Sequence, residues 1–164
     1  MSESFWLRDK EGNYQFTNTV NARQIVNLAA TILQESFVRG KPLECPADAA
    51  TLFKMKLGLR EQEIFAVVWL DNRHRLIQYE ELFFGTINGA SVHPREVVRR
   101  GIELNAAAVV FAHNHPSGVT EPSQADIAIT RRLKEALGLI DTRVLDHIVV
   151  SGNDHVSFAE RGLL

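Results

Sequence analysis

Continuous apolar runs alternate along this chain with stretches in which apolar residues recur every three or four positions. The runs at residues 63–71, 106–112 and 144–150 hold few polar residues, which is typical of strands buried on both faces of a sheet. Between them, helical spacing of apolar residues predicts helices at residues 94–105 and 123–137. Strands that alternate with helices indicate an α/β fold with helices on the faces of a central sheet.

Turn-forming residues at 71–74 separate the first of these runs from a second strand-like segment at residues 75–84, which predicts a β-hairpin. Residues 154–158 are expected to add a strand at an edge of the sheet. Strands of a hairpin are antiparallel, whereas parallel neighbours need a longer crossover, usually a helix. The predicted fold class is therefore α/β with a mixed sheet.

The first part of the chain is more polar. Residues 1–20 scatter aromatic side chains among charged and amide ones, which is typical of an arm or a short hairpin. Apolar residues from Asn21 to about Arg39 fall at helical spacing, and Asn21 and Gly40 are suited to begin and end this helix. Its single apolar stripe needs a cover, either the chain's own domain or a second copy in a homodimer.

A domain boundary is expected after this helix. Helix-breaking residues at positions 41–46 indicate a linker, and Pro46 can open a further helix that continues to about Leu57. We therefore expect an N-terminal arm and amphipathic helix over residues 1–45 and a main domain over residues 46–164.

Composition and charge narrow the functional classes. The 164 residues include 18 Lys and Arg against 20 Asp and Glu, so the formal net charge of −2 gives no overall bias toward nucleic acid or an anionic membrane. Cys45 is the single cysteine, which excludes an internal disulfide and a zinc site built from several thiolates. No segment resembles a secretory signal or approaches the ~20 apolar residues of a membrane span, so we expect a cytoplasmic protein with no membrane partner.

Candidate metal ligands follow the run at residues 106–112. His113 and His115 are separated by one residue, so both project to the same side of an extended segment. Asp126 comes at the start of a predicted helix. Two imidazoles and a carboxylate fill three corners of a tetrahedral zinc site and leave the fourth for water, which is the ligand count of a catalytic site.

Two further residues could serve such a centre. Glu63 stands at the start of the first buried run, where a carboxylate near the metal could take a proton from water. Ser123, three residues before Asp126, could stabilise a developing oxyanion. The pair Ser123-x-x-Asp126 is also a good N-terminal helix cap, and a carboxylate cannot be given fully to both the cap and a metal. Both interpretations stay open from the spacing alone.

These residues together resemble a known family. Glu63, the segment His113-x-His115-Pro116 and the pair Ser123-x-x-Asp126 match the motif of the JAMM (MPN-type) zinc metallopeptidases. The longer pattern His-Asn-His-Pro-Ser-Gly…Pro-Ser-x-x-Asp at residues 113–126, with Asp146-His147 downstream, is similar to the bacterial RadC branch of this family. The resemblance spans roughly residues 46–164.

The resemblance implies a three-layer α/β fold of the cytidine-deaminase-like type. It implies a zinc-dependent hydrolase that cleaves a peptide or isopeptide bond in a peptide or protein substrate. It also implies one zinc ion per chain held by His113, His115 and Asp126, with Glu63 as general base and Ser123 as oxyanion stabiliser.

Other residues near the motif are assigned to the cleft or to contacts behind the ligands: Asn114, Pro116, Ser117 and His147. A fourth protein ligand would close a zinc site to water, so His147 is expected to support a ligand rather than to bind the metal. Asn114 stands where JAMM deubiquitinating enzymes usually carry serine or threonine, so a ubiquitin-type substrate is not expected.

Three other carboxylates compete with Glu63 for the role of base: Glu61, Glu80 and Glu81. Glu63 is preferred because the family's glutamate directly precedes an apolar strand, and the run from Ile64 to Leu70 is that strand.

Three other functions can be compared with the sequence. A zinc deaminase would need His-x-Glu followed by Pro-Cys-x-x-Cys, which a single cysteine excludes. A metal-dependent nuclease or phosphodiesterase often uses two ions held by several carboxylates, and this motif supplies one. A DNA-repair-associated module that binds nucleic acid would depend on basic and aromatic residues that are not clustered like a stacking platform: Trp6, Tyr14, Arg73, Arg75, Arg99 and Arg100.

Overall fold

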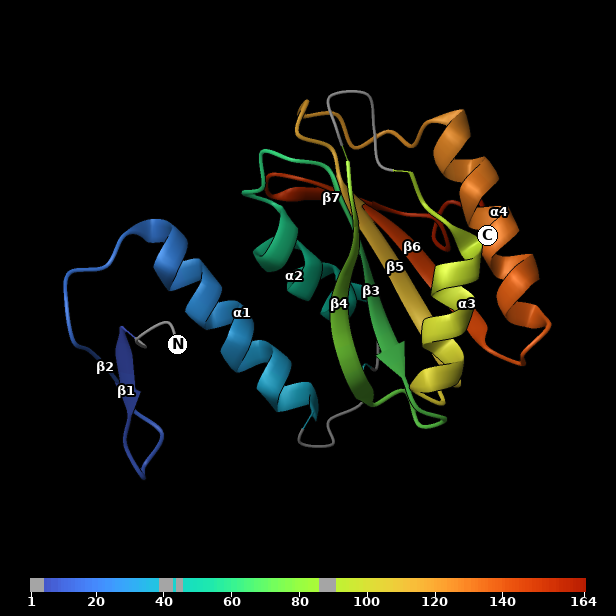
Figure 1. Cartoon of the computed structure of the whole chain (residues 1–164). Helices are drawn as coiled ribbons and strands as arrows, with labels where there is room; N and C mark the ends of the chain where they lie inside the picture. The colour runs from blue at the N-terminus through green and yellow to red at the C-terminus, as the bar shows by residue number, and fades with distance from the viewer. Residues whose placement is uncertain (1–4, 39–42, 44–45, 86–90) are drawn as a thin grey trace.

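The centre of the protein is a five-stranded sheet. The structure, a computed structural model, describes residues 5–38, 43, 46–85 and 91–164. The strands of the sheet are β3 (Ile64–Leu70), β4 (Leu76–Phe84), β5 (Ala108–Asn114), β6 (Arg143–Ser151) and β7 (Asp154–Ser157). They lie in the order β4-β3-β5-β6-β7 (Figure 1). Because β5 and β6 are parallel and the other neighbours antiparallel, the predicted mixed sheet, its hairpin and its edge strand are confirmed.

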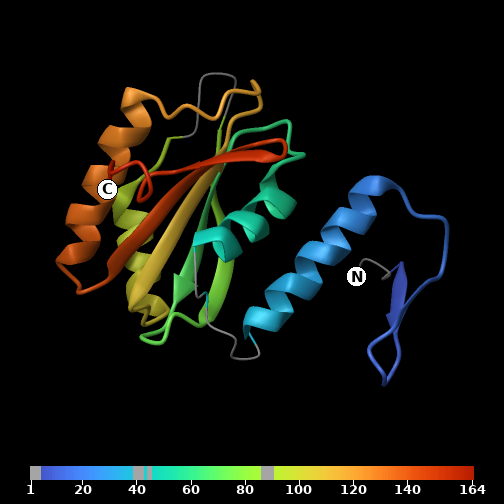
Figure 2. The ribbon, with the colours of Figure 1, turned by 180° about the vertical axis from the view of Figure 1, so that it is seen from behind.

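Helices cover both faces of this sheet (Figures 1 and 2). On one face lies α2 (Pro46–Leu57), and on the other lie α3 (Pro94–Glu103) and α4 (Gln124–Gly138). In β3, the even-numbered residues from Ala66 to Leu70 pack under α2, and the odd-numbered residues from Phe65 to Trp69 pack under α3 and α4. The run is apolar throughout because both of its faces enter a core.

The N-terminal segment forms a hairpin followed by a helix. The strands β1 (Trp6–Arg8) and β2 (Tyr14–Phe16) make a separate two-stranded sheet, and α1 (Ala22–Val38) follows. Asn21 caps α1 as predicted, because its Oδ1 accepts from the Gln24 backbone N–H at 3.0 Å while its own N–H donates to Gln24 Oε1 at 2.9 Å. The expected helix stop and most of the expected linker lie outside the described residues.

The apolar stripe of α1 is covered in part by this chain. The helix packs against α2 and β4, and Leu33 lies against the core under α2. Leu28 is 6% exposed, whereas Ile25 and Ile32 are 48% and 37% exposed. One side of the stripe therefore rests on the chain's own domain, and a contact between two copies through this helix stays a prediction.

The second long helix ends within one residue of its predicted end. It was predicted over residues 123–137, and as α4 its last residue is Gly138. Just beyond the helix Asp141 adopts φ +56°, and the Thr142 N–H donates to the Leu137 carbonyl at 3.0 Å. Across the described residues, no helix combines the length and the apolar character needed to cross a membrane.

The strand predicted at residues 106–112 is shifted toward the C-terminus. As β5 it ends at Asn114, because His113 and Asn114 still pair with Val149 and Val150 of β6. The first candidate ligand therefore belongs to the sheet itself, where two neighbouring strands fix its backbone.

Candidate metal centre

His113 is held at the C-terminal end of β5, between two other strands. Its backbone pairs with Phe65 on one side and with Val149 on the other. Strand alternation directs its side chain to the face covered by α3 and α4, where it is 2% exposed and its ring stacks on that of Phe65 at a centroid distance of 6.5 Å. A histidine this buried has little conformational freedom, so its two ring nitrogens face fixed partners.

His115 lies just past the strand and is anchored by β6. Its N–H donates to the Val150 carbonyl at 2.8 Å, and its own carbonyl accepts from the Ser151 hydroxyl at 3.0 Å. The ring nitrogen Nδ1 lies 2.7 Å from the Val119 carbonyl. A carbonyl can only accept, so Nδ1 carries a proton, and in the neutral ring Nε2 is then the nitrogen with the lone pair. Gly118, at φ +91°, allows the tight turn that brings Val119 back to the ring.

Asp126 lies in the first turn of α4 and completes a capping box with Ser123. Its Oδ2 accepts from the Ser123 N–H at 2.7 Å and from the Ser123 hydroxyl at 2.6 Å, while its own N–H donates to that hydroxyl at 3.1 Å. The other oxygen, Oδ1, lies 3.4 Å from His113 Nε2. The cap bonds to the carboxylate use Oδ2, and Oδ1 remains available to a metal ion, so the two interpretations of Ser123-x-x-Asp126 are compatible.

The Asp126 carboxyl is ionised in this setting. Burial raises its pKa, but the neighbouring His113 imidazole and the hydrogen bonds from Ser123 outweigh burial, so the pKa lies well below its ordinary value. A carboxylate that stays charged at any ordinary pH is a suitable ligand for a divalent cation.

The three candidate ligands converge. Nε2 of His113 and Nε2 of His115 are 3.0 Å apart, and Asp126 Oδ2 lies 3.7 Å from His115 Nε2. Tetrahedral zinc with ligands at about 2.0–2.1 Å would have neighbouring ligand atoms about 3.3 Å apart. Oδ1, the other oxygen of Asp126, lies 3.4 Å from His113 Nε2, so the two imidazole nitrogens and the carboxylate group are close enough together to hold a small cation. Among the described residues, this is the group of three whose ligand atoms could share an ion.

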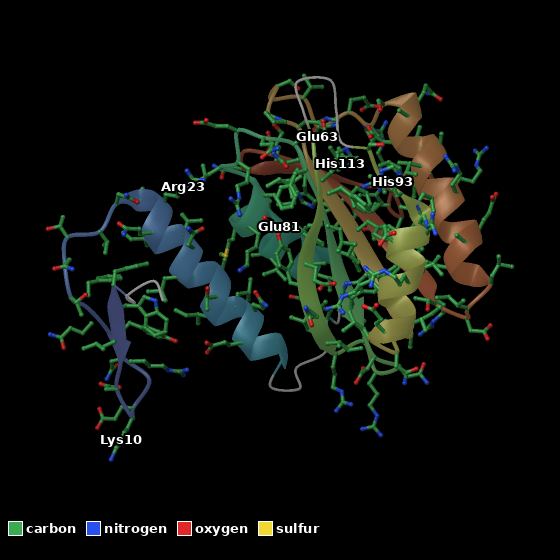
Figure 3. The ribbon with its side chains drawn as sticks, viewed as in Figure 1. Lys10, Arg23, Glu63, Glu81, His93 and His113 are labelled. Atoms are coloured by element: carbon green, nitrogen blue, oxygen red, sulfur yellow. The ribbon has the colours of Figure 1, made fainter. Side chains whose placement is uncertain are left out.

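Glu63 lies beside this group, directly before β3. It lines a cavity of about 250 Å³ together with His113 and Asp126, and it also lines an adjoining cavity of about 640 Å³ with His115. Figure 3 shows Glu63 and His113 at the same end of the sheet, with Glu81 farther along it. Glu63 is therefore one of the residues that line the cavities around the candidate ligands.

Asn114 fixes the backbone on both sides of Glu63. Its side chain points to the face opposite His113, where Oδ1 accepts from the Ile64 N–H at 2.8 Å and Nδ2 donates to the Gln62 carbonyl at 3.0 Å. The residue between the two histidines thus ties the strand that holds a ligand to the segment that holds the candidate base. Pro116 and Ser117 are exposed and line the larger cavity.

The competing carboxylates are placed differently. Glu80 accepts from Trp69 Nε1 at 2.8 Å and pairs with Arg100 at 2.7 Å. Glu81 pairs with Arg60 at 2.9 Å. Glu61 is exposed and lines the larger cavity beside Glu63. Glu80 and Glu81 are thus engaged in contacts elsewhere, and Glu63 lines both cavities beside the candidate ligands.

His147 lies behind His113 and does not join the ligand group. Its Nε2 is 2.8 Å from His113 Nδ1, and its Nδ1 is 2.6 Å from the Thr130 hydroxyl. Complete burial lowers the pKa of His147 far below its ordinary value, so the ring is neutral. Sequence reasoning missed Thr130, although a threonine four residues after Asp126 lies on the same face of the helix and could have signalled it.

Comparison with known proteins gives consistent results. A family model described as RadC-like JAB domain matches residues 43–163. Two proteins from Vibrio cholerae, each called UPF0758 protein, are 52% and 51% identical over 151 and 158 residues, which is 92% and 96% of this chain and 95% and 100% of theirs.

Other relatives are longer than this chain. A UPF0758 protein of Marinobacter nauticus is 59% identical over 139 residues, which is 85% of this chain and 62% of that protein. The match to a UPF0758 protein of Thioalkalivibrio sulfidiphilus also covers 62% of its length. The chain therefore spans less than two thirds of these two relatives.

Proposed function

The chain belongs to the RadC-like JAB (MPN-type) domain family, and from this premise together with the converging ligands we propose that it is a zinc-dependent hydrolase of peptide or isopeptide bonds. The observation that carries the proposal is the approach of two imidazole nitrogens and one carboxylate to 3.0–3.7 Å of one another. A zinc ion would be held by His113, His115 and Asp126.

Zinc in a site with three protein ligands lowers the pKa of water toward about 7 and polarises a carbonyl. Glu63 would accept a proton from the attacking water while the water oxygen forms a bond to the substrate carbonyl carbon. The same carboxyl would then give that proton to the leaving amine as the C–N bond breaks. Asn114, which holds the backbone on both sides of Glu63, would keep the carboxylate directed toward the cavity.

Ser123 would stabilise the negative charge that develops on the carbonyl oxygen. In the free protein its hydroxyl donates to Asp126 Oδ2 at 2.6 Å. Rotation of the hydroxyl proton toward substrate would leave the serine oxygen accepting from the Asp126 N–H, so the helix cap would survive the reaction.

A phosphodiester substrate is less well supported. Nucleases with two metals hold ions ~4 Å apart through several carboxylates. The group of three found among the described residues contains a single carboxylate. Two of the basic residues considered above as nucleic-acid contacts, Arg99 and Arg100, instead pair with neighbouring glutamates on α3.

The test compares Glu63→Gln with Glu81→Gln, a carboxylate engaged by Arg60 away from the cavity. The substrates are fluorogenic peptides linked through α-amines or through lysine ε-amines, with zinc added. Zinc-dependent turnover by the wild type should fall by about 10²–10⁴ in Glu63→Gln, with zinc retained, because only the base is lost. Glu81→Gln should keep its activity. Full activity in Glu63→Gln would remove this residue from the mechanism, and no zinc-dependent turnover by the wild type on either linkage would contradict the peptidase assignment.

A further inference from the structure

A buried chain of hydrogen bonds connects two of the candidate ligands from behind. Thr130 lies one turn after Asp126 on α4, and its hydroxyl is 2.6 Å from the Asp126 carbonyl oxygen and 2.6 Å from His147 Nδ1. His147 on β6 continues the chain, with Nε2 2.8 Å from His113 Nδ1. Thr130, His147 and His113 are 1%, 0% and 2% exposed, so water does not compete for these bonds.

The hydrogen bonds of this series all have the same donor-to-acceptor direction, from His113 through His147 and Thr130 to the Asp126 carbonyl. A carbonyl oxygen cannot donate, so the Thr130 hydroxyl gives its single proton to the Asp126 carbonyl. The Thr130 oxygen can then only accept from His147, which places the His147 proton on Nδ1. A second proton would make a fully buried cation, which is costly, so His147 Nε2 holds a lone pair and accepts from His113 Nδ1.

This direction of the hydrogen bonds determines the tautomer of His113 and therefore the state of its other nitrogen, Nε2. With its proton on Nδ1, the ring turns an Nε2 lone pair toward His115 Nε2 at 3.0 Å and toward Asp126 Oδ1 at 3.4 Å. His115 reaches the same tautomer independently, through its bond to the Val119 carbonyl at 2.7 Å. The two Nε2 atoms and the carboxylate, all of them acceptors unless a proton or a metal ion lies between them, therefore face one another, an arrangement that favours a cation at their centre.

We propose that Thr130 and His147 are positioning residues that hold His113 in the tautomer with Nε2 free for metal, and that they thereby raise the zinc affinity of the site. A histidine buried only for packing would need two hydrogen-bond partners of any kind. Both partners of His147 instead lead to candidate ligands, one through the His113 ring and one through the Asp126 backbone. The affinity claim rests on the proposed zinc site, but the tautomer claim does not require metal or hydrolysis.

The experiment reads the tautomer in metal-free protein labelled with ¹⁵N-histidine, by long-range ¹H–¹⁵N correlation, and then measures zinc affinity by competition with a chelating dye. In the wild type, His113 should show a protonated Nδ1. In His147→Phe, which removes the acceptor while keeping a ring, His113 should show a mixture of tautomers and zinc affinity should fall about 10–100-fold.

Rescue separates this role from simple packing. In His147→Gln, the amide oxygen can accept from His113 Nδ1, so the wild-type tautomer and most of the zinc affinity should return. His155→Phe, an exposed histidine on β7, is the matched control and should change neither quantity. An unchanged His113 tautomer and an unchanged zinc affinity in folded His147→Phe would overturn the proposal.

Thr130→Val keeps the test decisive if His147→Phe does not fold. Valine has nearly the shape of threonine but cannot accept the His147 proton. The His147 tautomer should become mixed and zinc affinity should fall several-fold. An unprotonated Nδ1 on His113 in the metal-free wild type would also overturn the assignment, whether or not the protein hydrolyses any peptide.

Discussion

Two polar clusters lie toward opposite ends of β3, on the side of the sheet that α3 and α4 cover, and they differ in how their protons and charges balance. In the first, the Glu80 carboxylate accepts from Trp69 Nε1 at 2.8 Å and from the Arg100 guanidinium at 2.7 Å. Every acceptor there meets a donor, and the anion meets a cation. The polar groups of this cluster satisfy one another, so a structural role is enough to account for it.

The second cluster is the candidate metal site. Its outer groups meet partners that complement them, whereas the groups at its centre do not. The outer nitrogens of His113 and His115 have partners 2.8 Å and 2.7 Å away, whereas their inner nitrogens face each other and a carboxylate. Both clusters are at least partly buried and rich in hydrogen bonds, so neither burial nor bonding distinguishes them. The excess of acceptors at one point distinguishes the candidate site from the structural network.

The largest expected effect is stabilisation by zinc. With free zinc about 1,000-fold above its dissociation constant, the free energy of unfolding should rise by about 4 kcal/mol, because only the folded chain gathers the three ligands. Asp126→Asn should abolish this rise, whereas Glu80→Gln should retain it. Chemical denaturation with and without zinc measures the difference, and an equal rise in Asp126→Asn would contradict the distinction between the two clusters.

A smaller effect is expected at the first cluster. Glu80→Ala leaves the indole N–H of Trp69, a residue with 0% exposure, without its acceptor, which should cost about 1–3 kcal/mol of unfolding free energy. Glu80→Gln still offers an amide oxygen and should cost less. Denaturation of metal-free protein measures both variants, and their zinc affinities should equal that of the wild type. A loss of zinc affinity in Glu80→Ala would mean that the two clusters are coupled.

The smallest expected effect separates the helix cap from the metal centre. Ser123→Ala removes the side chain that accepts from the Asp126 N–H, so metal-free protein should lose about 1 kcal/mol of unfolding free energy. Because Oδ1 of Asp126 does not take part in the cap, zinc should still bind. If zinc binding disappeared in Ser123→Ala, the division of labour between the two carboxylate oxygens would be wrong.

Sequence alone could predict the strands, the hairpin and the helices, because buried strands must be apolar on both faces and surface helices on one. It could also predict that His113 and His115 point the same way, since that follows from strand alternation. The end of α4 was predicted to within one residue, but the pattern carried no signal for the left-handed Asp141 that turns the chain beyond it.

The sequence placed His147 and Asn114 near the candidate ligands, but their particular contacts were beyond it because they join residues far apart in the chain. His147 meets His113 across 34 positions, and Asn114 meets the backbone beside Glu63 across 50. Spacing within one element carries no information about such pairs. From the sequence, the helix cap and a metal ion were competing interpretations of Asp126. Atomic positions were needed to show that the cap uses Oδ2 while Oδ1 faces His113.

The most direct test of the central claim is the zinc content of the purified protein by elemental analysis after dialysis against zinc, beside His113→Ala and the exposed control His155→Ala. The account predicts about one zinc per chain in the wild type and in His155→Ala, and almost none in His113→Ala, because two remaining ligands are too few for a tetrahedral site. No zinc in the wild type, or the same content in His113→Ala, would contradict the claim that the second cluster is a metal centre.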